Sequence, residues 1–419
     1  MNLRKILLTL VVITFASNLH SQYSVKVMQY NLMQFGNNFS DCNQTTNNIN
    51  QKIGYLKTIL DYVKPDIFTV NELSGDYNAQ LILNGSLNYN GQAKYQRATF
   101  KANSYTANTI FFNSEILALK EQKTIKTTPR LTDVYELYYK SPNLGVTEDT
   151  VFIRCFVTHL KAGSYEENVE ARRKSAEQIM LYRKYSNANN SLFMGDFNLY
   201  SADEPAFRLL TNYEIADINF NDPINQQGDW NNNSAFKKYH TQSTHTYGDC
   251  FSGGGMDDRF DFILVSNDLL TTNNLQYKND SYKAIGQDGS FFNQSLLSSG
   301  NTIPADVKNA LYNNSDHLPV YLELVINPQK LTATAVKSVK KNAIDILQSK
   351  TAVNIFSRSE ISNVDIRIVD CNGRSVYTKA NQNINTNGVE INTSKLNRGI
   401  YVIVVNNKQT YFSKKIIID

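Results

Sequence analysis

The sequence of 419 residues predicts an α/β or α+β sandwich built around two β-sheets, followed by a small all-β domain. Two observations predict the sandwich: strand-like apolar segments mix with helical spacing between Tyr23 and Asn327, and polar residues end several of the strands. The third observation is a change of pattern after residue 341. Beyond it, alternating strands and turn signals continue without helical spacing, which predicts the all-β domain.

The elements of the sandwich follow from periodicity. Val25–Tyr30 predicts a first strand that ends at Asn31. Apolar residues recur at helical spacing between Ile49 and Val63, and Pro65 ends that helix. Further strands are expected over residues 66–70, 109–112, 151–158, 192–194, 260–265 and 320–326, with a second helix over residues 169–185.

The chain is expected to contain four segments: a signal peptide (1–21), a large domain (22–327), a linker (328–345) and a C-terminal β-sandwich (346–419). Arg4 and Lys5 form a basic n-region, residues 6–15 form an apolar h-region, and small residues follow. That apolar run is too short for a bilayer core, which needs ~20 residues. We therefore expect an exported, soluble protein without a stable membrane span.

Charge and cysteines narrow the interpretation. Of the net charge of +4, the signal carries +2 and residues 329–419 carry +8, so residues 22–328 carry −6. The basic balance belongs to the tail and does not indicate a nucleic-acid partner.

Cys155 lies in an apolar strand and predicts a buried thiol, while Cys42 and Cys250 lie in polar loops and are the one pair we would test for a disulfide. The spacing of a Cys–His zinc cluster is missing.

Gly195-Asp196-Phe197-Asn198 follows an apolar strand. Asp196 and Asn198 alternate across Phe197 and would point to one side of an extended segment. One interpretation is a carboxylate that binds metal or water beside an amide that holds the phosphate or the nucleophile. The other is an ordinary turn, since Gly-Asp-x-Asn is a common loop composition.

A second polar run, Ser315-Asp316-His317, stands at a strand entrance, and Asp261 offers a carboxylate partner. A histidine held by an aspartate has a fixed tautomer and raised basicity, which suits the activation of water. The alternative is a surface loop. His159 ends another strand and would protonate a leaving oxygen or stabilise phosphoryl charge, or else be a hydrogen-bonded core histidine; His240 and His245 stay unassigned.

Asn31 and Glu72 also end strands. Glu72 would be an unpaired buried charge unless a metal or another cation neutralises it. Oxygen and amide ligands favour Mg²⁺, Mn²⁺ or Ca²⁺ over zinc. With the carboxylates and histidines above, this composition predicts metal-assisted phosphoester hydrolysis.

Six ordered motifs over about residues 24–326 resemble the endonuclease/exonuclease/phosphatase superfamily: Tyr30-Asn31, Asn71-Glu72, Thr158-His159-Leu160, Gly195-Asp196-Phe197-Asn198, Arg259-Phe260-Asp261 and Ser315-Asp316-His317. The resemblance implies a four-layer sandwich of two packed sheets flanked by helices. It also implies a divalent cation, with Mg²⁺ favoured. Met33 stands where some nucleases carry a second acidic residue, which favours one metal ion over two.

The same resemblance implies roles for single residues. Asn31, Glu72 and Asp316 would hold the metal, and Asp196 and Asn198 would orient the nucleophile and the phosphate. Asp261 would pair with His317, and His159 would act as an acid or a phosphate ligand. Members of the superfamily differ in whether a histidine or an aspartate is the base, so His317 and Asp196 are both candidates.

The tail resembles the sorting domain of the type IX secretion system, through residues Ser394–Tyr401 and Ser413–Ile418. The resemblance implies the secretion machinery as a partner and translocation across the outer membrane to the cell surface or medium. The Asn-Pro usual near the start of such domains is missing around Asn354. A small carbohydrate- or partner-binding β-sandwich is the alternative.

Export favours a monomeric nuclease that hydrolyses extracellular DNA or RNA by attack of activated water on phosphorus. One alternative is a sphingomyelinase-like lipid phosphodiesterase, with residues 135–139 as an exposed aromatic hairpin. Others are a phosphatase of soluble phosphomonoesters and a non-enzymatic binding module, which six intact motifs disfavour. Residues 287–314 are expected to form a loop or lid over the site that determines specificity.

Overall fold

The computed structural model describes residues 22–39, 41–102, 104–142, 144, 150–186, 189–271, 274–300, 302–327, 331, 344–348, 351–357, 360–385, 387–407 and 411–418. The chain divides into two compact units, Met1–Thr332 and Ala333–Asp419. The expected signal peptide and most of the expected linker lie outside the described residues.

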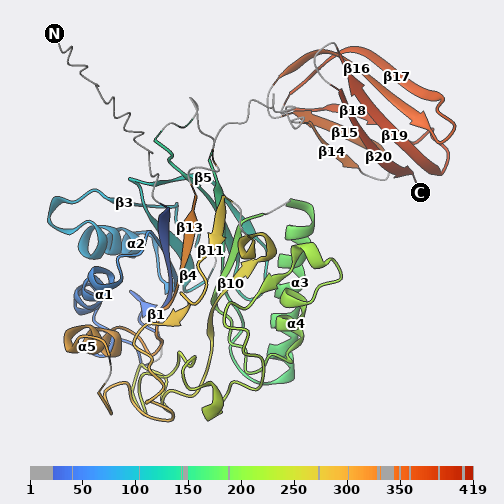
Figure 1. The fold of residues 1–419 in the computed structure, drawn as a ribbon. Helices are drawn as coiled ribbons and strands as arrows, with labels where there is room; N and C mark the ends of the chain where they lie inside the picture. Colours follow the sequence, from blue (N-terminus) through green and yellow to red (C-terminus); the bar gives the residue numbers. More distant parts are fainter. Residues whose placement is uncertain are drawn as a thin grey trace, which may run out of the picture. The chain divides into compact units, whose positions relative to one another are not determined.

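Two β-sheets form the centre of the larger unit (Figure 1). The strands of the first sheet are β1 (Tyr23–Phe35), β2 (Ile67–Leu73), β3 (Tyr95–Arg97), β4 (Ala107–Asn113), β11 (Leu275–Tyr277), β12 (Lys283–Ala284) and β13 (Val320–Ile326). They follow the order β11-β13-β1-β2-β4-β3, with β12 also beside β13. β1 and β2 are parallel, whereas β1 and β13 are antiparallel.

The strands of the second sheet are β5 (Leu117–Ile125), β6 (Thr132–Tyr139), β7 (Phe152–His159), β8 (Ser191–Asp196), β9 (Phe220–Asn221) and β10 (Asp261–Ser266). Their order is β5-β6-β7-β8-β10-β9. Only β7 and β8 are parallel among the pairs of this sheet that the described residues form. Each sheet therefore has one central parallel pair, and the parallel strands of a pair end at the same edge.

Helices cover the outer face of each sheet (Figure 1). On the first sheet lie α1 (Ile49–Val63), α2 (Asp76–Ile82) and α5 (Ala305–Asn314). On the second lie α3 (Glu166–Ser186) and α4 (Pro205–Thr211). Short helical turns join these elements: η1 (Leu83–Leu87), η2 (Tyr89–Gly91), η3 (Ala216–Ile218), η4 (Ser234–Phe236) and η5 (Asn267–Leu270). The layers run helix–sheet–sheet–helix, so the predicted four-layer sandwich is confirmed.

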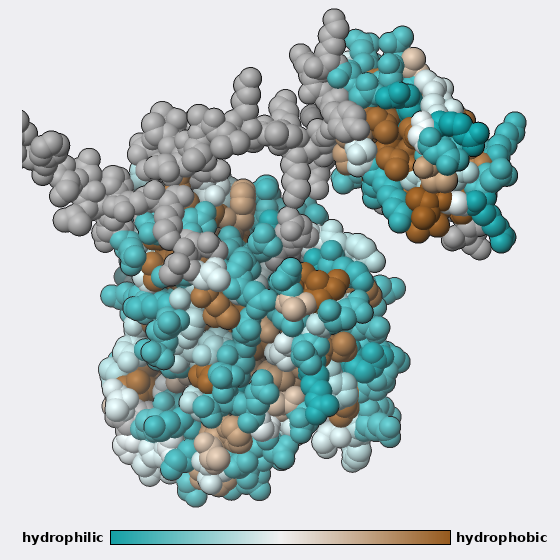
Figure 2. Space-filling model, turned by 45° about the vertical axis from the view of Figure 1, so that its right-hand side comes forward, coloured by the Kyte–Doolittle hydropathy of each residue, from teal (hydrophilic) through white to brown (hydrophobic). Residues whose placement is uncertain are grey.

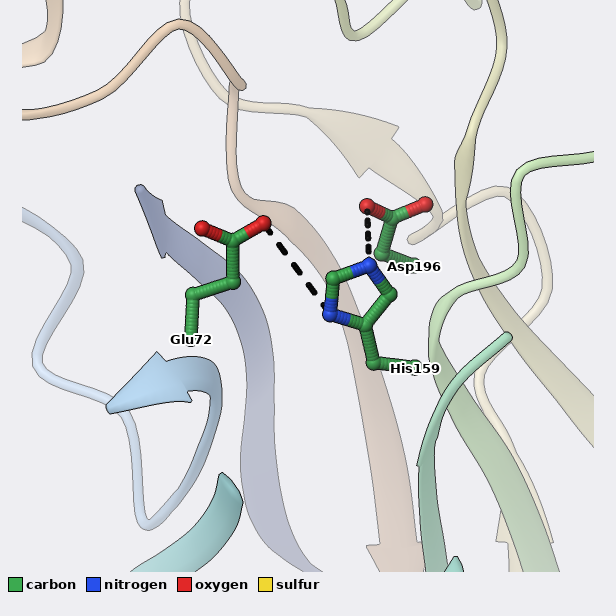
Figure 3. Close-up of side chains that lie close together, drawn as sticks. All are labelled: Glu72, His159 and Asp196. Atoms are coloured by element: carbon green, nitrogen blue, oxygen red, sulfur yellow. Dashed lines mark ion pairs between the residues drawn. The ribbon is translucent and has the colours of Figure 1, made fainter. Parts of the chain in front are cut away.

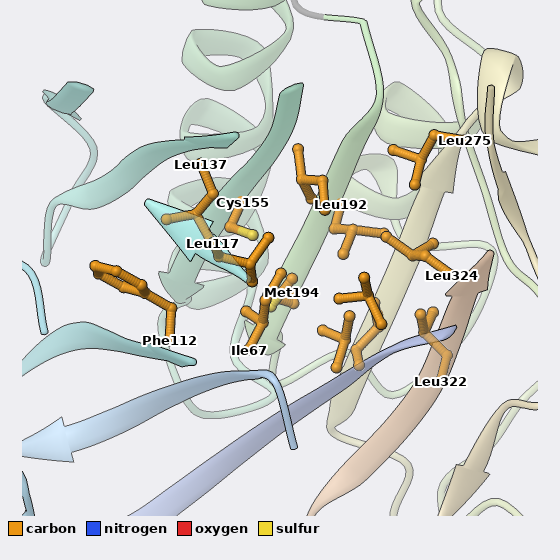
Figure 4. Packing of buried hydrophobic residues seen from close by; sticks show 14 of the residues in the cluster. Ile67, Phe112, Leu117, Leu137, Cys155, Leu192, Met194, Leu275, Leu322 and Leu324 are labelled. Atoms are coloured by element: carbon orange, nitrogen blue, oxygen red, sulfur yellow. The ribbon is translucent and has the colours of Figure 1, made fainter. Parts of the chain in front are cut away.

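Alternation along β1 explains how the first sheet is buried on both faces. Val25 and Val27 point into the core between the sheets, while Met28 and Tyr30 pack under the helices. Figure 4 shows the core between the sheets, where side chains of both sheets meet: Ile67, Phe112, Leu117, Leu137, Cys155, Leu192, Met194, Leu275, Leu322 and Leu324. Each fully buried side chain of this size contributes ~1.5–3 kcal/mol. The expected buried thiol of Cys155 is confirmed.

The first predicted helix is confirmed as α1. The Asn48 side chain caps it by accepting hydrogen bonds from the backbone N–H groups of residues 50 and 51. Lys64 adopts the left-handed conformation with φ 51° and ends the helix just before Pro65. The second predicted helix is confirmed as α3, three residues longer at its start.

The sequence pattern predicts that the first strand ends at Asn31, and this boundary is wrong. β1 continues to Phe35, and its pairing with β2 shifts between Asn31 and Phe35. Met33 and Gln34 have positive φ values of 45° and 49°. The hydrophobic pattern of the sequence does not reveal such a bulge, because the bulge depends on backbone conformation and the residues in it are no more polar than their neighbours in the strand.

Two further expectations are wrong. Residues 287–314 are not a lid throughout: α5 packs on α1 through buried Val307, Ala310 and Leu311, and Phe291 is also buried in that core. The segment of residues 135–139 is not an exposed hairpin either. Tyr135 and Leu137 lie in the core between the sheets, because alternate residues of the interior strand β6 face the first sheet.

The smaller unit is built from two sheets, β14-β15-β18 and β17-β16-β19-β20. Apolar side chains of both form one core. Its described residues contain no helix, as predicted for an all-β domain. The strands are β14 (Ile344–Gln348), β15 (Ala352–Ser357), β16 (Ile361–Asp370), β17 (Ser375–Ile384), β18 (Val389–Asn392), β19 (Gly399–Asn406) and β20 (Tyr411–Ile418).

The face of the larger unit seen in Figure 2 is mostly hydrophilic, with small scattered hydrophobic areas. Within the described residues, no helix combines the length and the apolar character that a membrane crossing requires.

Candidate active site

The candidate residues meet at one edge of the two sheets. In the first sheet, Asn31 of β1 pairs with Asn71 of β2, directly before Glu72. In the second, His159 ends β7 and pairs with Asp196, which ends β8. Because both pairs are parallel and the sheets are packed face to face, the strand ends bring these polar side chains together.

Gly195 allows the close approach of β7 and β8 at this edge. A Cβ atom at Gly195 would lie 1.8 Å from the carbonyl oxygen of Thr158, its partner in the strand register. Its φ of 144° is also one that side chains disfavour. The glycine of the Gly-Asp-x-Asn motif therefore has a structural role: it lets Asp196 lie beside His159.

The Asn31 amide lies between two carboxylates. Its Nδ2 donates to Glu72 Oε1 at 3.1 Å and to Asp196 Oδ2 at 2.9 Å. Its Oδ1 accepts from the backbone N–H of Met33 at 2.9 Å. The backbone N–H of Gln34 donates to Glu72 Oε2 at 2.8 Å. The bulge that the sequence does not reveal thus orients both Asn31 and Glu72.

His317 and Asp261 form the pair that the sequence suggests, with Nδ1 2.7 Å from Asp261 Oδ2. This leaves Nε2 facing Asp196, whose Oδ2 is 3.7 Å away. Ser315 fixes the backbone at His317. Its Oγ accepts from the His317 N–H at 3.1 Å and donates to the Asn31 carbonyl oxygen at 2.7 Å. The histidine is therefore oriented by both sheets.

Asp316 lies on the other side of His317. Its Oδ2 accepts from the Ser252 backbone N–H at 3.0 Å and from Gln242 Nε2 at 3.2 Å. Gln242 Nε2 also lies 2.8 Å from His317 Nε2. Asp316 Oδ1 is 3.9 Å from His317 Nε2 and has no hydrogen-bond partner in the described residues.

The sequence predicts an extended segment from Asp196 through Asn198, but the chain turns at Asn198. Its φ of 50° turns the chain. Its backbone N–H donates to Asp196 Oδ1 at 3.0 Å, and its Nδ2 donates to the Leu160 carbonyl oxygen at 3.3 Å. The turn and the functional interpretation are thus compatible, because the turn itself holds the carboxylate and the amide at the edge of the site.

Glu72, His159 and Asp196 form a group close enough to hold a metal ion, since one ligand atom from each lies within 4.8 Å of the others. Figure 3 shows the imidazole of His159 between the two carboxylates. Its Nε2 is 3.4 Å from Asp196 Oδ2 and its Nδ1 is 4.0 Å from Glu72 Oε1. Of the expected metal ligands, Asn31 contacts this group directly, and Asp316 approaches it through His317.

Burial and neighbouring charges shift the pKa values of Asp196, His317 and His159. Burial raises the pKa of Asp196 to about 7, with His317 opposing and Asp261 and Glu72 adding to the shift. Burial alone would lower the pKa of His317, but Asp261, Asp196 and Asp316 raise it well above its ordinary value. Burial, with the positive charges of Arg130 and His317, lowers the pKa of His159. The centre thus concentrates negative charge that a cation would stabilise.

Three buried polar atoms of the site fit the binding of a cation. His159 Nδ1, Asp261 Oδ1 and Asp316 Oδ1 are buried without a hydrogen-bond partner in the described part of the chain. Buried carboxylate oxygens are costly unless paired or bound to metal. The donor set, mostly oxygen with one imidazole, suits Mg²⁺ or Mn²⁺.

Some residues of the site are not recognisable from the sequence. Gln242 contacts Asp316 and His317, and Thr241 Oγ1 accepts from the backbone N–H of Asp261 at 3.2 Å. Both lie in a polar segment without periodicity. The two unassigned histidines of that segment contact other residues: His245 stacks on Phe251 and Tyr312, and His240 contacts a backbone carbonyl group. His240 Nε2 lies 2.9 Å from the Trp230 carbonyl oxygen.

The loops around the site are joined covalently. Cys42 and Cys250 form a disulfide across a sequence separation of 208 residues. Next to Cys250, Phe251 stacks on His245 at 4.0 Å between ring centroids, and Ser252 donates to Asp316. The pair singled out from the sequence is therefore a disulfide that braces the segment holding Asp316.

Comparison with solved structures gives matches at low sequence identity. An endonuclease/exonuclease/phosphatase family protein from Bacteroides thetaiotaomicron has a TM-score of 0.47 at 16% identity, covering 74% of this chain and 100% of that one. The B. thetaiotaomicron mannosyl-6-phosphatase has a TM-score of 0.45 at 15% identity, with 72% and 100% covered. D. rerio TDP2 in complex with a single-strand DNA product has 0.45 at 15%, with 72% and 98% covered.

Sequence comparisons identify only the tail. No curated protein matches the chain. Residues 349–419 match a family model described as the secretion system C-terminal sorting domain, as the motifs of the tail predict. The comparisons thus identify residues 349–419 as similar to the secretion system C-terminal sorting domain.

Proposed function

We propose that the protein is an exported phosphodiesterase that depends on a divalent metal and hydrolyses extracellular nucleic acid. One observation carries the proposal: the ends of both sheets bring together the oxygen donors Glu72 and Asn31, the carboxylate of Asp196 beside His159, and a histidine oriented by a carboxylate, His317–Asp261. Metal-assisted hydrolysis needs these parts within reach of one phosphorus atom.

Glu72 would hold the metal together with Asn31 and Asp316. Glu72 and Asn31 are already in contact, and Asp316 Oδ1 is buried without a partner in the described residues. A bound Mg²⁺ or Mn²⁺ would polarise the phosphoryl oxygen and stabilise the charge that develops on it. Asn198, held by its turn against Asp196, would donate its amide to a phosphate oxygen.

Between the two candidates for the base, the geometry favours Asp196. Its Oδ2 faces the Nε2 atoms of His159 and His317 at 3.4 and 3.7 Å. Asp261, Asp196 and Asp316 raise the pKa of His317 well above its ordinary value, which suits it to stabilising negative charge. Asp196 would therefore take the proton of the attacking water, and His317 would stabilise the phosphoryl charge. His159, held neutral by burial, would position the carboxylate.

Nucleic acid is the substrate class that the observations support best. The exposed aromatic hairpin that would favour a lipid substrate does not exist, since Tyr135 and Leu137 are buried. The sorting domain supports export, and extracellular nucleic acid is an accessible polymer of phosphodiesters. The secretion machinery would be the partner of the tail.

The test uses the purified mature protein with plasmid DNA, RNA, sphingomyelin and a phosphomonoester, each with EDTA, Mg²⁺, Mn²⁺ or Ca²⁺. We expect hydrolysis of nucleic acid that stops with EDTA and returns with Mg²⁺ or Mn²⁺. His317→Ala should reduce it by ~10³-fold or more. An active His317→Ala protein contradicts the mechanism, and activity on sphingomyelin alone contradicts the substrate.

Metal binding has a separate readout. Calorimetric titration with Mn²⁺ should give one site of high affinity in the wild-type protein and a loss of that heat in Glu72→Gln. Glu170→Gln is a matched control, since Glu170 is an exposed carboxylate on α3 paired with Arg173. Equal Mn²⁺ binding by Glu72→Gln and wild type would exclude Glu72 as a ligand.

A further inference from the structure

Two cations, Arg130 and Lys161, flank the strand end that carries His159. Arg130 lies just before β6, which pairs with β7 in antiparallel orientation. Its Nη1 donates to the carbonyl oxygens of His159 at 3.5 Å and Leu160 at 3.3 Å. Lys161 is the next residue of the chain. Both cations therefore border the candidate active site.

The carbonyl oxygen of Leu160 joins Arg130 to Asn198. Asn198 Nδ2 donates to the same oxygen, also at 3.3 Å. The guanidinium of Arg130 and the amide proposed to hold the scissile phosphate are therefore neighbours around one acceptor atom. An anion at Arg130 would lie beside that phosphate and would not occupy its place.

The loop that carries Arg130 is held in a defined position. Thr127 Oγ1 donates to the Arg130 carbonyl oxygen at 2.5 Å. Ser175 Oγ of α3 donates to the Thr128 carbonyl oxygen at 2.9 Å, and the hydroxyls of Thr132 and Thr158 lie 2.9 Å apart. The loop is thus anchored to both α3 and β7. A cation on such a loop needs little reorganisation to bind a ligand.

Neither cation has an acidic partner among the residues that the structure describes. Arg154 and Arg172 form ion pairs with Glu136 and Glu204 at 2.5 and 2.7 Å. Within the described residues, Arg130 and Lys161 form no ion pair, although residues 22–328 carry a net charge of −6. Their hydrogen bonds go to backbone carbonyl oxygens, which leave charge uncompensated. A half-buried guanidinium with this environment fits an anionic ligand.

We propose that Arg130 and Lys161 bind the phosphate next to the one that is hydrolysed. The inference rests on the proposed function and narrows its substrate to a chain of phosphodiesters. A nucleic acid strand carries a phosphate at each nucleotide, so a neighbouring phosphate is always present. A lipid phosphodiester with a single phosphate and a cationic head group would gain nothing from this pair of cations.

Binding tests the subsite without catalysis. The probe is a fluorescently labelled single-stranded DNA octamer, with anisotropy measured on His317→Ala and on the same protein with Arg130→Gln and Lys161→Gln. We expect the double substitution to raise Kd by ~10-fold or more and to lower the salt dependence of binding, since each lost phosphate contact removes ~0.7 from the slope of log K against log salt. Lys184→Gln is the control, because Lys184 pairs with Glu214 at the distant end of α3.

Equal affinity of the two proteins, including absence of binding by both, overturns the subsite. If the double variant does not fold, Lys161→Glu, which changes an exposed head group, should still weaken binding by ~10-fold, and unchanged binding also overturns the proposal.

Measurements of kcat/KM then distinguish the loss of the proposed subsite from damage to the reaction centre. Arg130→Gln/Lys161→Gln should keep kcat/KM for bis(4-nitrophenyl) phosphate within ~3-fold and lose ~10-fold or more on the octamer. An equal loss on both substrates would place the cations at the scissile phosphate and overturn the proposal. If the wild-type protein hydrolyses neither substrate, the proposed function fails, while the anisotropy still decides the subsite.

Discussion

His317 Nδ1 lies 2.7 Å from Asp261 Oδ2, which joins a loop residue before β13 of the first sheet to the first residue of β10 in the second. The contact is fully buried. It fixes the tautomer and ring orientation of the histidine, and it aims Nε2 at Asp196. The two sheets must therefore keep their relative position for the site to work.

Asp261→Asn should lower kcat/KM on nucleic acid by ~10²–10⁴-fold, because the neutral amide does not hold His317 in the ring orientation and protonation state that the Asp261 carboxylate selects. Its shape is conserved, so KM should change less than kcat. Steady-state kinetics with thermal unfolding as a control will check this. An Asp261→Asn protein with wild-type kcat would show that the carboxylate has no part in the reaction.

Gly195→Ala should prevent correct folding of the edge that carries the site. The added Cβ would lie 1.8 Å from Thr158 O, and the left-handed φ adds strain. We expect a loss of several kcal/mol in the free energy of unfolding, above the ~1–3 kcal/mol of ordinary overpacking. Denaturant unfolding measures it. Gly54→Ala is the control, since Gly54 is in α1 and a Cβ there meets nothing within 4 Å.

Removing the disulfide by Cys42→Ser/Cys250→Ser should lower the free energy of unfolding by ~2–5 kcal/mol. It should also raise the Mg²⁺ concentration for half-maximal activity, because Ser252, two residues after Cys250, donates to Asp316. Cys371→Ser is the matched control, an exposed thiol outside the larger unit. Unchanged Mg²⁺ dependence in the double variant would separate the disulfide from the site.

Stability should fall as the pH rises from ~4 to 7 because of Asp133. Burial raises its pKa to about 7, partly offset by the hydrogen bond from Asn108. The folded state therefore keeps this carboxyl protonated where the unfolded chain ionises it, so the stability it contributes is complete below pH ~4 and is lost as the pH rises through 7. Over about three pH units this is on the order of 4 kcal/mol.

Asp133→Asn should make that fall in stability smaller by the Asp133 contribution, while Asp196, whose pKa burial also raises, keeps its own; unfolding is followed in urea at pH 4, 5.5 and 7. Asp203→Asn serves as the control, because the Asp203 side chain is 81% exposed and should show no such difference. Parallel pH curves for wild type and Asp133→Asn would contradict the assignment.

Periodicity was sufficient for the elements whose apolar face is continuous. α1 and α3 have such faces, and their predicted positions are confirmed. α5 was not recognised, because it is short, Asn314 interrupts its buried face and the preceding segment reads as loop. The bulge after Asn31 also escaped detection, since it depends on φ at Met33 and Gln34 and leaves no compositional trace.

The centre of the site was more predictable than its surroundings. Asn31, Glu72, His159 and Asp196 could be named because each follows an apolar run in the sequence, and the ends of such runs converge in a sandwich. Gln242 and Arg130 could not, because they lie in loops whose path is set by tertiary contacts. Both are polar residues among other polar residues, and only the hydrogen bonds to Asp316 and Leu160 distinguish them.

β1 pairs with β13 along seven residues, and Ser24 Oγ donates to Glu323 Oε2 across 299 residues of sequence. The centre of the first sheet therefore cannot close until the last strand of the larger unit has left the ribosome. At ~5–20 residues per second this takes tens of seconds. During that time the growing chain lacks its central strand pairing. The connectivity of the fold thus makes the first sheet the part of the larger unit whose completion depends on nearly all of that unit's chain.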